Sequence, residues 1–228
     1  MKESPILFSV EMIRAILDGQ KTITRRVIKP QPDVQGWQHA TLQPDSFGTW
    51  SYPAGAGGRW KCPYGRSGDG LWVREAWRVG AWSVNNGGFA VDYKADNSCR
   101  KEWLHCEDDN VWMRLWKQST YDAIKMFGSG DQTWEPGKSP CRWRPSIFMP
   151  RWASRIALEI VSVRVERLRE ISRDDCVREG LPPITCGDPE RAMRVKFSTL
   201  WDSINTNREC GWDLDPWVWV IEFKRIHE

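Results

Sequence analysis

The sequence predicts a mixed α+β fold in which strands form a small barrel and the few helices gather at two places along the chain. The predicted order is strand, helix, several strands, two helices and strand, which suits a small barrel better than a doubly wound sheet. In the long strand predicted over 155–168, the apolar residues change face partway along. Such a switch indicates a bulge or a sharp bend, as in a closed barrel. The last strand, over 217–226, is apolar on both faces, so we expect it to be central or to close the barrel.

Length and composition narrow the class of protein. The 228 residues suit one large domain, or one domain with a big insertion. The net charge of +3, from 33 basic and 30 acidic residues, is too mild to indicate nucleic-acid binding by itself. No stretch approaches the roughly 18 consecutive apolar residues of a membrane span, and the first residues lack the apolar core of a signal peptide. We therefore expect a cytoplasmic protein with no membrane partner.

Cysteine and histidine usage argues against a metal centre. The seven cysteines include no C-x-x-C pair, and only three histidines are present. A disulfide framework is not expected in a cytosolic chain, and zinc would need ligands at tighter spacing. We predict no metal and no cofactor. The sixteen tryptophans are the unusual feature; most are expected to pack in the core, and a few could stack on bases.

The N-terminal third predicts a strand, a helix and a long irregular stretch. A short strand over 5–9 is followed by a helix with Ser9 as its N-cap and an apolar face of Val10, Ile13, Ile16 and Leu17. Gly19 is suited to end this helix in the left-handed conformation. Prolines and glycines then predict loops over 29–66, and the turn at 68–70 leads into a strand over 71–77. In that strand Glu75 shares a face with apolar residues, so its carboxylate is paired, exposed at a strand end, or functional.

The rest of the chain predicts an insertion, two helices and the last strand. We expect 80–144 to be irregular apart from one hairpin, with its turn at 85–88, its return strand over 89–93 and a solvated acidic loop over 106–110. Ser172 begins a helix that ends at Glu179 and Gly180. Asp188 caps the final helix, whose predicted apolar stripe is Met193, Phe197, Leu200, Trp201 and Ile204.

Three side chains suggest hydrolytic chemistry. Lys21 and Thr24 place an amine near a hydroxyl, which is the minimum for an activated oxygen nucleophile. Glu179 stands at a helix C-terminus, where carbonyl groups repel an anion. A nearby cation such as Lys21 would offset this repulsion and explain why a glutamate is found there. Lys21 could then deprotonate Thr24 for attack on a carbonyl carbon, as in Ser-Lys enzymes. In an extended segment Lys21 and Thr24 point to opposite faces, so they converge only if a turn or bulge intervenes.

The stretch Gly19-x-Lys21-x-x-Thr24-x-Arg26 resembles the G-x-K-x-x-T-x-R signature of the ASCH domain, a member of the PUA-like barrel superfamily. The resemblance continues in the turn at 68–70, in Glu179-Gly180-Leu181 and in the last strand. It covers 4–30, 68–78 and 145–228 and leaves 31–67 and 80–144 as insertions in a single domain over 1–228. The segment 146–150 and the many tryptophans resemble ASCH proteins of phage and prophage genomes. The resemblance implies a compact barrel with helices packed at its ends.

The resemblance also implies an activity. Small bacterial ASCH proteins include amidohydrolases that remove the acyl group from N4-acetylcytidine and related cytosines. Lys21 and Thr24 match their catalytic lysine and threonine, Glu179 matches the glutamate by its place at a helix end, and Glu75 is the competing carboxylate. The implied partner is a nucleoside or nucleobase. The residues expected to bind it are Arg26, Glu75, Trp72, Ser146, Phe148 and Met149.

A different class of function stays open at the level of the sequence. PUA-like barrels often bind RNA, and the chain carries arginines beside tryptophans in one short region. These could contact phosphates and stack on bases. The alternative is therefore a non-catalytic module that binds RNA or a modified base, through Arg142, Arg144, Arg151 and Arg155 together with Trp143 and Trp152.

Overall fold

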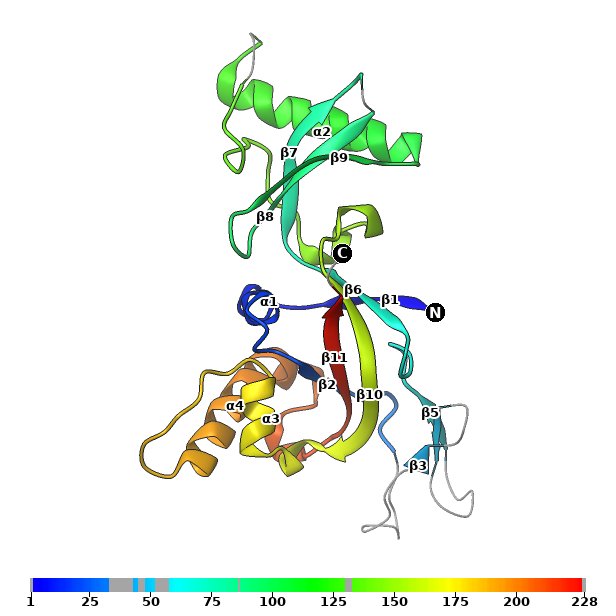
Figure 1. Cartoon of the computed structure of the whole chain (residues 1–228), viewed down its shortest axis with the longest axis vertical. Coiled ribbons are helices and arrows are strands. Elements are labelled where there is room, and N and C mark those ends of the chain that lie inside the picture. The colour runs from blue at the N-terminus through cyan, green and yellow to red at the C-terminus, as the bar shows by residue number, and fades with distance from the viewer. Residues whose placement is uncertain are drawn as a thin grey trace. The chain divides into compact units, whose positions relative to one another are not determined.

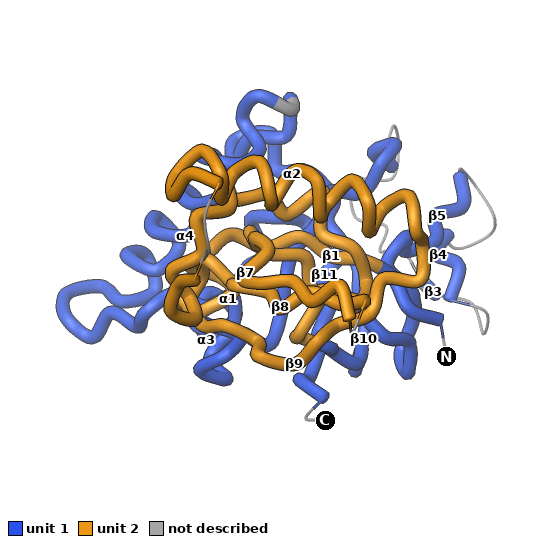
Figure 2. The backbone as a smooth tube through the Cα atoms, turned by 90° about the horizontal axis from the view of Figure 1, so that it is seen from above, with its two compact units in different colours: residues 1–4, 15–71, 157–228 blue, residues 5–14, 72–156 orange. Residues whose placement is uncertain are grey.

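The structure, a computed structural model, describes residues 2–32, 43–44, 48–51, 58–85, 87–129 and 133–226. The chain forms two compact units (Figure 2). Unit 1 comprises Met1–Ser4, Ala15–Leu71 and Ala157–Glu228, and unit 2 comprises Pro5–Arg14 and Trp72–Ile156. Each unit is therefore assembled from stretches that are distant in the sequence.

The chain contains both helices and strands, which confirms the mixed α+β class (Figure 1). The α-helices are α1 (Val10–Leu17), α2 (Asp109–Phe127), α3 (Arg173–Arg178) and α4 (Pro189–Asn205). The strands are β1 (Glu3–Leu7), β2 (Ile23–Val27), β3 (Gln43–Pro44), β4 (Thr49–Ser51), β5 (Arg59–Lys61), β6 (Gly70–Arg74), β7 (Trp77–Ser83), β8 (Gly88–Tyr93), β9 (Cys99–His105), β10 (Ala157–Arg167) and β11 (Trp217–Ile226). The 3₁₀ helices are η2 (Ser146–Phe148), η3 (Arg151–Ala153), η4 (Leu168–Glu170), η5 (Thr206–Arg208) and η6 (Trp212–Leu214).

The largest sheet has five strands in the order β1-β6-β10-β11-β2. β11 pairs antiparallel with β10 on one side and with β2 on the other, so the last strand is central, as its two apolar faces predicted. The register of β10 shifts between Ile160 and Ser162, which confirms the bulge predicted from the switch of apolar face. Within the described residues β1 and β2 are the edge strands of this sheet. The sheet is therefore open, whereas the sequence had suggested a closed barrel.

Helices α3 and α4 share a core with this sheet in unit 1. Ile23, Val218 and Val220 of the sheet pack with Cys176 of α3 and with Met193, Phe197 and Trp201 of α4. Both predicted helix starts are confirmed, because the Ser172 hydroxyl accepts from the Asp175 N–H and Asp188 Oδ1 accepts from the Arg191 N–H.

One predicted member of the α4 stripe is wrong. Ile204 is exposed, and Asn205 is buried in its place. Steps of four residues turn about 40° beyond a full circle, so the inward line through 193, 197 and 201 continues to 205. Asn205 satisfies its side-chain amide by donating to the Trp201 carbonyl at 3.1 Å.

The loop predicted over 29–66 contains a second small sheet, of order β3-β4-β5. Trp50 of β4 faces Trp60 of β5 across the pair, and both side chains are buried. Each of these strands is only two or three residues long. A stretch that short carries no readable alternation, which is why the sequence predicted loops alone.

Unit 2 overturns the prediction that 80–144 is irregular. It holds the sheet β7-β8-β9 and the 19-residue helix α2, and Figure 1 shows α2 running along this sheet. The hairpin prediction was correct, because β8 returns along β7, although Asn86 of its turn lies outside the described residues. The acidic loop is exposed over 107–110, as predicted, and it leads directly into α2, since the Asp108 side chain accepts from the N–H groups of Asn110 and Val111.

The core of unit 2 lies between its sheet and α2. Trp77, Phe89, Val91 and Tyr93 of the sheet pack with Leu115 of α2, and Met149 and Ala153 of the following segment complete the cluster. No helix in the described part of the chain is both long enough and apolar enough to cross a membrane.

Candidate functional site

Lys21 lies in a turn between α1 and β2. Gly19 has a φ of 72°, and the N–H groups of Gln20 and Lys21 both donate to the Ala15 carbonyl at 2.9 Å. β2 begins only at Ile23. The direction of the Lys21 side chain is therefore set by this turn and not by strand alternation.

The turn directs Lys21 to the end of α3. Its Nζ donates to Glu179 Oε2 at 2.6 Å and to the Glu179 carbonyl at 2.7 Å. The Lys21 side chain is 0% exposed and that of Glu179 is 5% exposed. The Lys21 ammonium group thus compensates the negative charge of the Glu179 carboxylate and the partial negative charge of the carbonyl groups at the C-terminus of α3. Burial lowers the pKa of Lys21, and the attraction of Glu179 opposes that shift without cancelling it.

Arg25 holds the same carboxylate from the other side. Its Nη1 donates to Glu179 Oε1 at 3.4 Å, and its Nη2 contacts Glu166 and Asp175. The Arg25 side chain is fully buried. Lys21 and Arg25 therefore fix the two oxygens of Glu179 separately. The sequence analysis did not identify Arg25. Because side chains two residues apart in a strand share a face, Arg25 lies on the same face as the apolar Ile23, and this could have indicated that Arg25 is buried.

Gly180 allows this close approach. Its φ is 96°, and a Cβ at this position would lie 2.9 Å from the Ala15 Cβ and 3.3 Å from the Lys21 Cβ. Carbon atoms in contact normally lie about 3.5–4.0 Å apart. The residue after Glu179 must therefore be a glycine for α3 to end against Lys21.

Thr24 lies inside β2, opposite Ile221 of β11, and is 3% exposed. Neighbouring residues of a strand point to opposite faces, so Thr24 points away from the face on which Arg25 meets Glu179. Arg26 lies on the opposite face of β2 from Arg25, and its guanidinium is 6.0 Å from the centre of the Tyr64 ring. The structure thus brings Lys21 and Glu179 together, and the convergence of Lys21 with Thr24 stays a prediction.

Glu75, the competing carboxylate, belongs to unit 2 and has a different partner. The strand predicted over 71–77 is broken, since β6 ends at Arg74 and β7 begins at Trp77, and Glu75 is buried in the break. Arg155 donates to both of its oxygens, at 2.8 and 2.9 Å. Burial raises the pKa of Glu75, against the opposing effect of Arg155.

The other predicted substrate residues lie in unit 2 in unlike surroundings. Trp72 and Met149 are buried, and the Glu75 N–H donates to the Met149 sulfur at 3.3 Å. Ser146 is half-buried at the start of η2, whereas Phe148 is 70% exposed. Met149 is therefore a core residue next to Glu75, and Phe148 presents its ring to solvent.

Several of the arginines and tryptophans that the sequence suggested for RNA binding already contact other side chains of unit 2. Arg155 binds Asp96 as well as Glu75, and Trp152 packs against Trp77 with ring centres 5.9 Å apart. Arg142 pairs with Asp122. These contacts leave fewer groups for a phosphate backbone than the sequence suggested.

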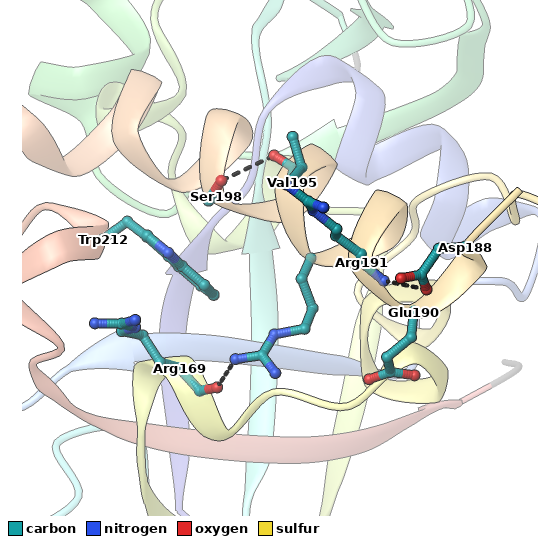
Figure 3. A pocket seen from close by; sticks show the side chains of 8 residues that line it. Arg169, Asp188, Glu190, Arg191, Val195, Ser198 and Trp212 are labelled. Carbon is teal, nitrogen blue, oxygen red and sulfur yellow. Dashed lines mark hydrogen bonds between the residues drawn. The ribbon is translucent and has the colours of Figure 1, made fainter.

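A hollow of about 400 Å³ opens beside the first turns of α4 in unit 1 (Figure 3). Arginines line it together with Asp188, Glu190 and Trp212. Arg194 donates to the Arg169 carbonyl, and Asp188 caps the helix. Acidic side chains line the hollow together with the arginines, and the two hydrogen bonds just described have structural roles. The hollow therefore suggests neither a catalytic nor a ligand-binding role.

Known proteins and metal-binding patterns add no further information about this site. Comparison with protein-family models, curated proteins and solved structures found no match to the chain. Across the described residues, no group of three or more His, Cys, Asp or Glu side chains is arranged to hold a metal ion. The buried cluster of Lys21, Arg25 and Glu179 is therefore the feature of unit 1 that points to a function.

Proposed function

We propose that the protein is an amidohydrolase that removes the acyl group from N4-acylated cytosine derivatives such as N4-acetylcytidine. The observation that carries the proposal is the fully buried Lys21 amine, 2.6 Å from Glu179, in a stretch that matches the G-x-K-x-x-T-x-R signature. The same signature supports the narrower proposal of an ASCH-like, PUA-related fold, as does the helix end that meets Lys21.

Lys21 is suited to act as the general base. A buried amine with a lowered pKa carries a larger neutral fraction near neutral pH than a solvated lysine, and only the neutral amine can accept a proton. Glu179 orients this amine, and Arg25 in turn orients Glu179. Lys21 donates to Glu179 in the structure, so the proposal requires the amine to reach Thr24 when substrate is bound.

The proposed reaction proceeds in two steps. Lys21 accepts the proton of the Thr24 hydroxyl as the Thr24 oxygen bonds to the acyl carbon, and Arg26 or backbone N–H groups stabilise the oxyanion. The bond from the acyl carbon to N4 then breaks, and Lys21 returns the proton to N4. Water hydrolyses the resulting acyl ester of Thr24, releasing the carboxylic acid and restoring the hydroxyl.

Incubation of the purified protein with N4-acetylcytidine tests the proposal, with cytidine measured by chromatography. Thr24→Ala and Lys21→Met are each expected to lower kcat by about 10²–10⁴-fold. Thr22→Ala is the matched control, because Thr22 is a nearby threonine whose hydroxyl accepts from Arg178 at 3.1 Å and has no role in the proposed reaction. Cytidine formation that survives both Thr24→Ala and Lys21→Met would overturn this mechanism.

A further inference from the structure

Unit 2 contains a cavity that the proposed hydrolysis does not use. It has a volume of about 460 Å³ and lies between one face of α2 and the segment 142–150. This volume falls within the roughly 300–1,000 Å³ of small-ligand sites. Its lining includes no Asp or Glu and three arginines, Arg114, Arg142 and Arg144. The cavity lining therefore carries positive charge and no carboxylate, with the Arg144 guanidinium 5.7 Å from the centre of the Trp77 ring.

Arg144 shows this imbalance most clearly. Its Nη1 donates to the neutral Gln118 amide at 2.7 Å, and its Nε and Nη2 are buried with no hydrogen-bond acceptor in the described part of the chain. Neither Arg144 nor Arg114 forms an ion pair with a described residue, and Asp122 is bound to Arg142 at 3.0 Å. Burial lowers the pKa of Arg144, and the charges of Arg142 and Arg114 add repulsion. A bound anion would relieve this repulsion.

The remaining walls are flat and apolar. The aromatic rings of Trp77, Trp143 and Phe148 line the cavity. Trp77 is buried, yet its indole N–H has no hydrogen-bond partner among the described residues. Phe148 is 70% exposed, so its ring is accessible to a ligand. The Arg78 guanidinium already lies 4.4 Å from the centre of the Trp143 ring. Aromatic rings pack well against a planar ligand.

We propose that this cavity binds a nucleotide, with its phosphate toward Arg114 and Arg144 and its base against Trp143 and Phe148. Arginine suits phosphate because its planar guanidinium donates two parallel hydrogen bonds. A free nucleoside monophosphate and a residue of single-stranded RNA share this chemistry. The inference goes beyond the proposed hydrolysis, because it uses neither Lys21 nor Thr24.

Calorimetric titration with adenosine 5′-monophosphate tests the site, since a purine nucleotide is not a substrate of the proposed cytosine chemistry. We expect saturable binding that Arg114→Gln weakens at least about tenfold and Phe148→Ala at least about fivefold. Arg114 is exposed on α2, so its replacement leaves the core intact. Lys117→Gln is the matched control. It removes the same charge from the same helix, does not line the cavity, and should change the Kd less than about twofold.

Further probes identify the source of the nucleotide. Adenosine and inorganic phosphate should each bind at least about tenfold more weakly than the monophosphate, because each lacks one half of the ligand. A single-stranded RNA octamer that binds more tightly than the monophosphate supports the site and assigns it to RNA, and weaker binding supports it and assigns it to a free nucleotide. The proposal is overturned if neither probe saturates, if Arg114→Gln and Lys117→Gln bind alike, or if only an acidic aromatic peptide binds.

Discussion

Substitution of Gly180 by alanine tests whether α3 must end directly against Lys21. Two costs follow from the structure. The φ of 96° is unfavourable for a residue with a Cβ, at about 1–2 kcal/mol. The added Cβ would also lie 2.9 Å from the Ala15 Cβ, and overpacking of this kind costs about 1–3 kcal/mol. Gly180→Ala is therefore expected to lower the free energy of unfolding by about 2–5 kcal/mol.

A second glycine separates the two costs. Gly187 has a φ of 71°, and nothing lies within 4 Å of the Cβ that alanine would add there. Gly187→Ala should therefore lose only the backbone cost of about 1–2 kcal/mol. Urea unfolding followed by tryptophan fluorescence measures both variants. Equal losses of unfolding free energy in Gly180→Ala and Gly187→Ala would refute the close contact with Ala15 and Lys21.

Three further predictions concern charged side chains. Lys21→Met leaves Glu179 without its nearest cation and should cost about 3–5 kcal/mol of unfolding free energy; Glu179→Leu added to it should recover part of that loss, as a double-mutant cycle would measure. Arg25→Met removes one of the two cations that hold each of Glu166, Asp175 and Glu179, which keep Arg164 and Lys21 as partners, so we expect a loss of about 1–3 kcal/mol in urea unfolding at pH 7. Although burial alone would raise the pKa of Asp96, hydrogen bonds from Arg155 and Ser98 lower it from 3.8 to about 2. The folded state thus releases that proton more readily than the unfolded state, so the stabilisation is present above pH 3.8 and is lost as the pH falls toward 2. Asp96→Asn should then cost about 1 kcal/mol near neutral pH, after discounting for its exposed third, and this difference should vanish in unfolding curves near pH 2.

Local signals predicted much of unit 1. Ser172 and Asp188 each supply a cap that fixes where a helix starts, and the apolar run at 217–226 marked a central strand before any pairing was known. The meeting of Lys21 with Glu179 was also predicted, because an anion at a helix C-terminus requires a compensating cation. Arg25 was not, since its three acidic partners come from parts of the chain 141–154 residues away and no local pattern joins them.

Unit 2 was harder to predict for a physical reason. The residues that α2 buries fully are Leu115, Ser119 and Ala123, while Val111, Trp112 and Trp116 pack against the core only partly buried. Two of the three fully buried positions thus hold small residues, which leaves no clear apolar stripe in the sequence. The break in the predicted strand at Glu75 was equally hidden, because the apolar alternation of 71–77 continues through it.

The division of the chain between the units also determines which unit can fold first during synthesis. Once synthesis has passed Ile156, every residue of unit 2 exists, whereas unit 1 still lacks β10, β11, α3 and α4. Lys21 and Glu179 are separated by 158 residues, so the lysine is made long before the carboxylate that will neutralise it. Contacts this remote in sequence form slowly, because a long loop must close first. On the ribosome, unit 2 can therefore fold first, and the buried cluster of Lys21, Arg25 and Glu179 forms only near the end of synthesis.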